Sequence, residues 1–265
     1  MTSDERVVGG GGEVELRVDA AAGGRISSLR IRGEELLVTR EPDPLRWGSY
    51  PMAPFAGRLR NGELLFGAHR YQFPRNMPPH AIHGTVFNKP WEWIADDMLE
   101  VELGDEWPWP GHVEQRFRVE DGLICISLEI HAADRPFPAS AGFHPWFRRQ
   151  LGRGGPLRLD VDPGFCYACD GTGIPTGELV EPGEGPWDDT FTGFRGDPAI
   201  EWPGALRLEM SSNHAHWVLY EHPAHAVCVE PLTSPPNAVN GAAHLVKPGR
   251  PLRLEMQLRW QHLDC

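Results

Sequence analysis

The stretch VEQRFRVEDGLICISLEIHA, residues 113–132, decides the fold class. Apolar and polar side chains alternate on both sides of Asp121-Gly122, with the period of a half-buried β-strand. Asp-Gly between two alternating runs is a strong signal for a tight antiparallel hairpin. The sequence therefore predicts two strands, residues 113–119 and 123–130, joined by a turn at 121–122.

Strand-like patterns continue on both sides of this hairpin. No stretch keeps a 3.6-residue period over three turns, and 30 glycines and 26 prolines divide the 265 residues into short pieces. We therefore expect one domain over residues 1–265 with an all-β fold, a large antiparallel β-sandwich or barrel. The runs that carry this prediction are EVELRVDA (13–20), ISSLRIRG (26–33), ELLFGAHRYQF (63–73), PLRLDVD (156–162), AHWVLYE (215–221), AVCVEPL (226–232) and PLRLEMQLRW (251–260).

Long proline-rich segments separate the predicted strands. Long loops in a compact domain tend to carry function, so we expect the functional residues on these loops or on the strand ends beside them. The segments are residues 41–62, 74–92, 103–112, 135–147 and 181–199.

Composition restricts the function classes. The net charge of −12, from 25 basic and 37 acidic residues, argues against nucleic acid or an anionic membrane as partner. There is no run of about 18 apolar residues, and the stretch MTSDERVVGGGG (1–12) lacks the apolar region of a secretory signal, so a soluble cytoplasmic protein is expected. The lone CxxC of Cys166 and Cys169 has no second pair, which disfavours a zinc or redox role.

One histidine lies in the middle of SAGFHPWFRR, residues 140–149. His144 follows small residues and Phe143, and Pro145 and Trp146 come after it. An imidazole with an ordinary pKa of about 6.5 suits acid–base work near neutral pH. Taken alone, the stretch fits a proton-transfer catalyst, a metal ligand or a packed core histidine.

A carboxylate lies in an apolar strand, in AVCVEPLTSPPN (226–237). Strand alternation places Val227 and Val229 on one face and Cys228 with Glu230 on the other. Because burying an unpaired carboxylate is unfavourable, Glu230 should have a partner or a task that needs a shifted pKa.

Three further clusters hold polar residues in the long segments. Arg58 lies in PMAPFAGRLRNG (51–62), where a guanidinium on a stiff loop can bond two oxygens, or pair with a carboxylate at the surface. His80 and His83 lie in NMPPHAIHG (76–84), where the prolines make a helical metal site unlikely to form. Asp188 lies between aromatic residues in WDDTF (187–191), as in sugar sites or in a solvated acidic loop.

A competing metal motif is present in NHAHWVLYE, residues 213–221. His214, His216 and Glu221 have the internal spacing of the first metal motif of the cupin barrels. The glycine expected upstream is replaced by Leu208, and no second motif supplies a further histidine. The metal-site interpretation therefore ranks low.

Taken in order, the clusters resemble the aldose 1-epimerase (galactose mutarotase-like) family over nearly the whole chain. The chain is shorter than typical galactose mutarotases and is more similar to a divergent bacterial branch of the family. The resemblance implies a large antiparallel β-sandwich with long loops. It rests on YPMAPFAGRLRNG (50–62), HAIHGTVFNKPW (80–91), SAGFHPWF (140–147), WDDTF (187–191), VCVEPLTSPPNAVN (227–240) and LVKPGRPLRLEMQLRW (245–260).

The resemblance also implies residue roles. His144 matches the general acid that protonates the sugar ring oxygen, and Glu230 matches the general base that takes the proton of the anomeric hydroxyl. His83 matches a second histidine near the ring oxygen or C1 hydroxyl. Arg58 and Asp188 match residues that bind sugar hydroxyls.

Neighbouring residues extend or depart from this pattern. Phe143 and Trp146 are candidates for walls of the sugar pocket, or for the packing that fixes the His144 imidazole. The family often has asparagine where this chain has Gly57, a second glycine where it has Thr85, and tyrosine where it has Trp146. These departures leave the sugar open and the acid–base pair intact.

The implied function is a mutarotase that opens and recloses an aldose ring without metal or cofactor, because no redox step or difficult leaving group is involved. The expected partner is a small-molecule sugar, and the expected assembly is a monomer or homodimer. One alternative is a hexose-6-phosphate 1-epimerase, and another is a carbohydrate-binding protein without catalysis. The phosphate alternative needs cations near the loops, for which the candidates are Arg58, Arg60, Arg75, Arg148 and Arg149.

Overall fold

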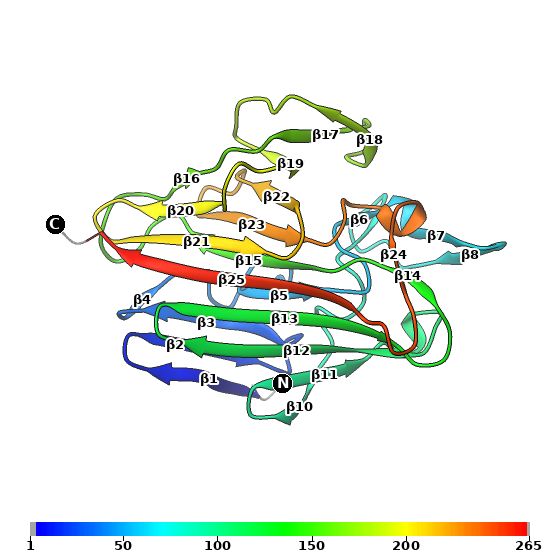
Figure 1. Cartoon of the computed structure of the whole chain (residues 1–265), viewed down its shortest axis with the longest axis horizontal. Coiled ribbons are helices and arrows are strands. Elements are labelled where there is room, and N and C mark those ends of the chain that lie inside the picture. Colours follow the sequence, from blue (N-terminus) through cyan, green and yellow to red (C-terminus); the bar gives the residue numbers. More distant parts are fainter. Residues whose placement is uncertain (1–3, 264–265) are drawn as a thin grey trace.

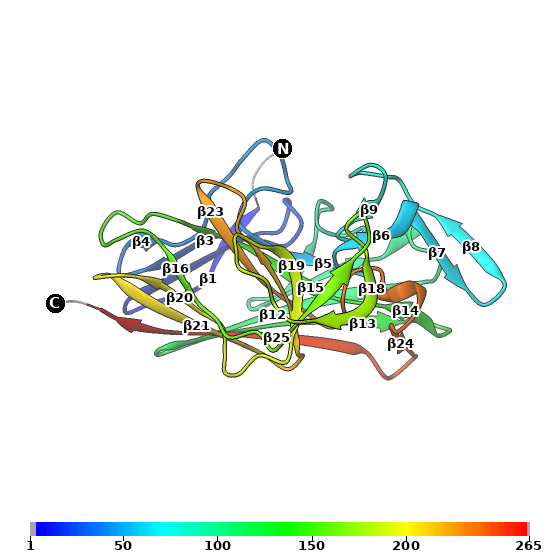
Figure 2. The same cartoon turned by 90° about the horizontal axis from the view of Figure 1, so that it is seen from above.

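The computed structural model describes residues 4–263, so residues 1–3 of the N-terminal stretch and Cys265 lie outside it. Two large antiparallel sheets form the fold (Figures 1 and 2). The first has eleven strands in the order β1-β2-β3-β5-β15-β23-β22-β19-β17-β18, with β4 beside β3. Its strands are β1 (Glu5–Gly11), β2 (Val14–Asp19), β3 (Arg25–Ile31), β4 (Glu34–Glu35), β5 (Ser49–Met52), β15 (Gly142–Arg148), β17 (Phe165–Cys169), β18 (Pro175–Val180), β19 (Asp188–Thr192), β22 (His216–Tyr220) and β23 (Ala226–Leu232).

The second sheet has eight strands in the order β10-β11-β12-β13-β25-β21-β20-β16. They are β10 (Glu92–Ala95), β11 (Met98–Glu102), β12 (Gly111–Glu120), β13 (Leu123–Ala132), β16 (Arg158–Asp160), β20 (Ala199–Trp202), β21 (Leu206–Ser212) and β25 (Leu252–His262). The predicted hairpin is confirmed, since β12 and β13 pair from Glu120↔Leu123 to Gly111↔Ala132.

Smaller elements gather mainly at one end of the molecule, on the right in Figures 1 and 2. They are the strand pairs β6 (Arg58–Leu59) with β9 (Ala81–Ile82), β7 (Glu63–Phe66) with β8 (His69–Gln72) and β14 (Phe137–Ala139) with β24 (His244–Val246), and the 3₁₀ helices η1 (Arg60–Gly62), η2 (Gly104–Glu106) and η3 (Ala238–Asn240). Residues 4–263 contain no α-helix, which confirms the all-β prediction. Over the same residues, no helix has the length and apolarity needed to cross a bilayer.

The main core lies where apolar side chains of the two sheets meet. Phe143 and Phe147 of β15 and Val229 of β23 belong to it, together with Phe117 of β12. Alternate residues of β15 and β23 point away from this core, to the outer face of the eleven-stranded sheet. This outer face is where the candidate site lies.

Three of the predicted loops instead contain strands inside the eleven-stranded sheet: β5 lies in the segment 41–62, β15 in 135–147 and β19 in 181–199. Residues 142–147 of the segment 135–147 belong to β15, which lies between β5 and β23. The segment was predicted as a loop because it is rich in proline, which is rare in central strands since it lacks a backbone N–H donor. Gly142 allows the close packing there, because a Cβ at this position would lie 2.5 Å from side-chain atoms of Leu232 and Met52.

Candidate active site

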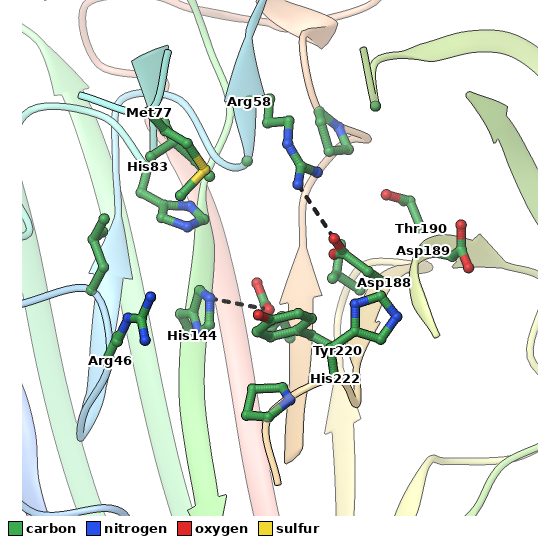
Figure 3. Close-up of a pocket in the computed structure, with 18 of the residues that line it drawn as sticks. Arg46, Arg58, Met77, His83, His144, Asp188, Asp189, Thr190, Tyr220 and His222 are labelled. Atoms are coloured by element: carbon green, nitrogen blue, oxygen red, sulfur yellow. Dashed lines mark hydrogen bonds and ion pairs between the residues drawn. The ribbon is translucent and has the colours of Figure 1, made fainter. Parts of the chain in front are cut away.

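A cavity of about 650 Å³ opens on the outer face of the eleven-stranded sheet. Strands β15, β22 and β23 form its floor, and loops with β6 and β19 form its walls (Figure 3). The residues proposed from the sequence that line it are Arg58, His83, His144, Trp146, Asp188 and Glu230. They come from five separate regions of the chain, and the fold brings them to one place.

His144 and Glu230 lie in contact on the floor of the cavity. Nε2 of His144 is 3.3 Å from Oε1 of Glu230, and the two residues are 5% and 3% exposed. Their strands are neighbours, because β15 pairs with β23. The expectation that Glu230 has a partner is met by His144.

Aromatic rings enclose the His144 imidazole. Tyr50 stacks on it with ring centroids 4.8 Å apart, and the Trp146 ring lies 5.4 Å away and nearly parallel. His83 approaches edge-on at 5.0 Å. Tyr50 is fully buried and was not predicted as a site residue, because its place beside His144 depends on strand pairing. The strand pair β5–β15 places it opposite His144.

Burial governs the protonation of these groups. Burial lowers the pKa of His144 to about 3. Burial and the nearby Asp188 raise the pKa of Glu230 well above its ordinary value, while Arg58 opposes this shift. Both shifts favour the uncharged forms, so the pair holds a single proton over a wide pH range.

His83 is held by an unusual backbone conformation. Its φ is 64°, and the φ of Gly84 is 79°, both in the left-handed region. A Cβ on Gly84 would lie 1.9 Å from the carbonyl oxygen of Ala53, so the chain can approach this closely only with glycine. The His83 backbone N–H donates to the carbonyl of Gly57 at 3.0 Å, and burial followed by the neighbouring His144 lowers the pKa of the His83 ring well below its usual range.

Arg58 and Asp188 form an ion pair in the cavity. The distance from Nη2 of Arg58 to Oδ2 of Asp188 is 3.4 Å, and both side chains are about one-third exposed (Figure 3). Arg58 lies on β6, whose pairing with β9 (Arg58↔Ile82) also brings it beside His83. Hydroxyl groups of a ligand can hydrogen-bond to the two charged side chains in place of part of their ion pair.

Two histidine-motif residues do not join the cavity. Phe143 is a correction to the predicted pocket wall, since it is 0% exposed in the core between the sheets. Neighbouring residues of a strand face opposite sides, so Phe143 and His144 cannot both face the cavity. His80 is structural, because its ring accepts from the backbone N–H of Asn61 at 3.1 Å and contacts the carbonyl oxygen of Thr172 at 3.0 Å.

Four of the five candidate phosphate-binding arginines are engaged elsewhere. Arg148 donates to the carbonyl of Leu37 at 2.7 Å, and Arg149 donates to the carbonyls of Glu221 and Pro223. The remaining two form a salt bridge of Arg60 with Asp170 and a hydrogen bond from Arg75 to the carbonyl of Asn61.

The side chains of the cupin-like motif turn to different partners. His214 Nε2 contacts the carbonyl oxygen of Arg253 at 3.0 Å, and His216 Nδ1 contacts the Tyr167 hydroxyl at 3.3 Å. Glu221 Oε2 accepts from the backbone N–H of Trp187 at 3.3 Å. The motif therefore forms no common ligand set in this fold.

The CxxC pair is split between two sides of β17. Both cysteines are free; Cys166 is buried in the core, whereas Cys169 is exposed and lines the cavity. Other lining residues were not predicted from the sequence. They are Arg46, Met77, Asp189, Thr190, Tyr220 and His222. Four of them lie in motifs quoted above without a role of their own: Asp189 and Thr190 in WDDTF, Met77 in NMPPHAIHG and Tyr220 in NHAHWVLYE.

The protein is thus an antiparallel β-sandwich with a cavity on the outer face of one sheet and a buried histidine–glutamate pair on the cavity floor. The sequence model of the aldose 1-epimerase family matches residues 19–259, and the chain belongs to this family. A comparison with curated proteins finds no match.

Solved structures share the fold over almost the whole chain. A candidate aldose 1-epimerase from Escherichia coli K12 is 20% identical, with a TM-score of 0.81 over 95% of this chain and 97% of that chain. A galactose mutarotase-like protein from Clostridium acetobutylicum is 19% identical, with a TM-score of 0.80 over 95% and 93%. A galactose 1-epimerase from Lactobacillus acidophilus NCFM is 15% identical, with a TM-score of 0.76 over 99% of both chains.

Proposed function

We propose that this protein is an aldose 1-epimerase that interconverts the α and β anomers of an aldose. The observation that carries the proposal is the contact of 3.3 Å between His144 and Glu230 on the floor of a cavity of about 650 Å³. Ring opening of a hemiacetal needs an acid at the ring oxygen and a base at the anomeric hydroxyl. Because both oxygens are bonded to C1, two side chains this close together can each serve one of them.

In the proposed mechanism, Glu230 removes the proton of the C1 hydroxyl while His144 protonates the ring oxygen. The C1–ring oxygen bond breaks, and C1 becomes the carbonyl carbon of the open aldehyde. Rotation about the C1–C2 bond then presents the other face of the carbonyl. His144 takes back the proton of the C5 hydroxyl as the ring closes, and Glu230 returns its proton to the carbonyl oxygen.

The protonation of the pair suits this cycle. The closed-ring step starts with the shared proton on His144, and the open-chain state has it on Glu230, so the pair keeps the same net charge throughout. Burial lowers the pKa of His144 and raises that of Glu230, which favours the open-chain arrangement and lowers the barrier to proton transfer from the sugar.

The remaining cavity residues are assigned to orientation of the sugar. Arg58 and Asp188 offer charged donors and an acceptor for ring hydroxyls from opposite walls. His83 lies beside the His144 ring and is kept uncharged, so it can hydrogen-bond the sugar without competing for the shared proton. Trp146 supplies an apolar surface beside the imidazole.

The test is mutarotation followed by polarimetry, with the spontaneous rate subtracted, for glucose, galactose, other aldoses and their 6-phosphates. Glu230→Gln and His144→Gln should each lower the catalysed rate by roughly 10²–10⁴-fold, as expected for loss of a general acid or base. The matched controls are Glu92→Gln and His69→Gln, which change exposed residues of the same types on β10 and β8.

The outcomes separate the proposed function from its alternatives. Wild-type rates in Glu230→Gln and His144→Gln would remove the mechanism. A clear preference for 6-phosphates would place the protein in the hexose-6-phosphate branch, with Arg46 at the cavity as the first cation to vary. Saturable sugar binding without rate acceleration would make the protein a carbohydrate binder.

A further inference from the structure

A second cluster of chemically competent side chains lies outside the cavity, on the outer face of the eight-stranded sheet. His112 and Glu114 of β12 and His131 of β13 alternate with residues such as Val113 that point into the core. Strands β11, β12 and β13 lie side by side there (Figure 1). The cavity opens on the outer face of the other sheet, so the cluster and the cavity are on opposite faces of the sandwich.

The strand register brings the two imidazoles together. His112 and His131 are direct cross-strand partners, and their rings stack with centroids 4.6 Å apart and an interplanar angle of 8°. The Glu114 carboxylate lies between them, with Oε1 3.4 Å from Nε2 of His112 and Oε2 3.8 Å from Nε2 of His131. One ligand atom from each of the three residues lies within 4.8 Å of the others.

Two more carboxylates flank this group. Oε2 of Glu129 is 3.3 Å from Nε2 of His131, and Oε2 of Glu100 is 3.8 Å from Nε2 of His112. Glu100, Glu114 and Glu129 are direct neighbours across β11, β12 and β13, and like charges in such positions destabilise a sheet.

The side chains at hand neutralise this charge incompletely. The Arg253 guanidinium pairs with Glu129 at 3.3 Å, which leaves Glu100 and Glu114 facing the two imidazoles. Carboxylate oxygens of Glu129 and Glu114 lie 3.3 and 3.8 Å from the buried Nε2 atom of His131, but within residues 4–263 this atom makes no hydrogen bond. A single cation shared by the imidazoles and carboxylates satisfies all of these groups.

We propose that His112, Glu114 and His131 form a binding site for one divalent first-row transition cation, with Glu100 and Glu129 as the candidate fourth ligand. Neutral imidazole and carboxylate suit Zn²⁺ and its neighbours in the first row, whereas Ca²⁺ and Mg²⁺ take oxygen ligands. Ligands at about 2.0–2.1 Å from a tetrahedral Zn²⁺ lie about 3.3 Å apart. The carboxylate–imidazole separations of 3.3–3.8 Å are close to this value, and binding would rotate the stacked imidazoles so that both nitrogens face the ion.

The bound cation cross-links neighbouring strands of the sheet. It joins β12 to β13 through side chains that are 25–30% exposed, so the ion can enter from solvent. Because the folded register assembles the ligands, the ion binds the folded chain and stabilises it by mass action. The metal site is remote from His144 and Glu230 and does not take part in sugar chemistry.

The test measures metal binding directly. Chelator-treated protein is titrated with Zn²⁺ at pH 7.5 by calorimetry, and with Co²⁺ by visible absorption. We expect one saturable site per chain and a rise in melting temperature of roughly 5 °C at a hundredfold excess over the Kd. His131→Gln, His112→Gln and Glu114→Gln should each weaken binding by at least about tenfold, since changes to groups that merely support a metal ligand already have that effect.

Two controls keep the result specific. His69→Gln changes an exposed histidine on β8 and should leave affinity unchanged. The described residues also bring His144, Cys228 and Glu230 close enough to hold an ion, so the Co²⁺ spectrum must lack the near-ultraviolet charge-transfer band of a thiolate ligand. Near-ultraviolet circular dichroism checks that each variant is folded.

Three results would overturn the proposal. The first is the absence of saturable Zn²⁺ binding below millimolar concentration in the wild type. The second is unchanged affinity in folded His131→Gln and Glu114→Gln proteins. The third is a thiolate band that disappears in Cys228→Ser, because it would assign the ion to the cavity instead.

Discussion

Tyr50 and His144 lie directly opposite each other on β5 and β15, and their rings stack with centroids 4.8 Å apart. The Tyr50 hydroxyl donates to the carbonyl of Leu45 at 3.2 Å, which fixes the phenol ring. Nδ1 of His144 is buried and has no hydrogen-bond partner within the described part of the chain. In many acid–base sites a hydrogen bond to Nδ1 orients the imidazole. Here, packing between the rings of Tyr50 and Trp146 orients it instead.

Replacing Tyr50 by leucine should lower kcat with little change in KM. An aromatic stacking contact contributes about 0.5–1.5 kcal/mol, so loss of orientation should lower kcat by roughly 2- to 10-fold. Tyr50→Phe keeps the ring and should stay near the wild-type rate. Values of kcat and KM measured by polarimetry for the two variants check the prediction. If kcat falls equally in Tyr50→Leu and Tyr50→Phe, the hydroxyl group and not the ring is responsible.

The pH profile of mutarotation should be flat where an ordinary histidine titrates. The pKa of His144 is lowered to about 3, so the pair gains a second proton only well below pH 6.5. The pKa of Glu230 is raised well above that of an ordinary carboxyl, so the pair keeps its proton far above pH 4.5. We expect kcat at pH 5.5 within about twofold of that at pH 7.5.

The measurement needs the spontaneous rate at each pH, because acid and base also catalyse mutarotation. A single titration of kcat with a midpoint near 6.5 would contradict the prediction, since it would mean that His144 titrates independently of Glu230. The protein should be checked for unfolding at each pH. A histidine that is buried uncharged lowers the free energy of unfolding as the pH falls below the pKa that it has in the unfolded chain.

The sequence was sufficient for features that depend on local periodicity. The β12–β13 hairpin and the opposite faces of Val229 and Glu230 follow from a period of two and are confirmed. Features that depend on the pairing of distant strands could not be predicted from the sequence. Tyr50 could not be joined to His144, because that contact is set by register between segments 94 residues apart.

The proline-rich composition of the segment 135–147 also misled the interpretation of the site. It was predicted as a loop, yet its residues 142–147 belong to β15, which lies between β5 and β23. Placing the motif on a strand would have separated Phe143 from His144 at once. The aromatic residue was assigned to the wrong face because a loop has no alternation to apply.

Asp188→Asn should raise KM more than it changes kcat. Asp188 pairs with Arg58 at 3.4 Å from across the cavity, and its proposed role is to bind hydroxyls in the ground and transition states alike. A hydrogen bond to a charged group is worth about 1.5–3 kcal/mol, which corresponds to a rise in KM of roughly 10- to 100-fold. Steady-state kinetics check this, with Asp197→Asn as an exposed control, and a fall in kcat at constant KM would contradict it.

Gly84→Ala should destabilise the protein and weaken catalysis together. Its φ of 79° is costly for alanine, and the new Cβ would lie 1.9 Å from the Ala53 carbonyl oxygen, which accepts a hydrogen bond from the Thr85 N–H at 2.9 Å. The backbone must shift next to His83, so we expect a loss of at least about 3 kcal/mol in the free energy of unfolding.

Gly12→Ala is the matched control for this substitution. Gly12 has a similar φ of 68°, but nothing lies within 4 Å of the position of its Cβ. It should therefore show only the backbone strain of about 1–2 kcal/mol and keep full activity. Urea unfolding and mutarotation of both variants separate backbone strain from steric collision. Equal losses in the free energy of unfolding would mean that φ alone explains the effect of Gly84→Ala. A larger loss with reduced kcat in Gly84→Ala would show that the close approach to Ala53 holds His83 at the cavity.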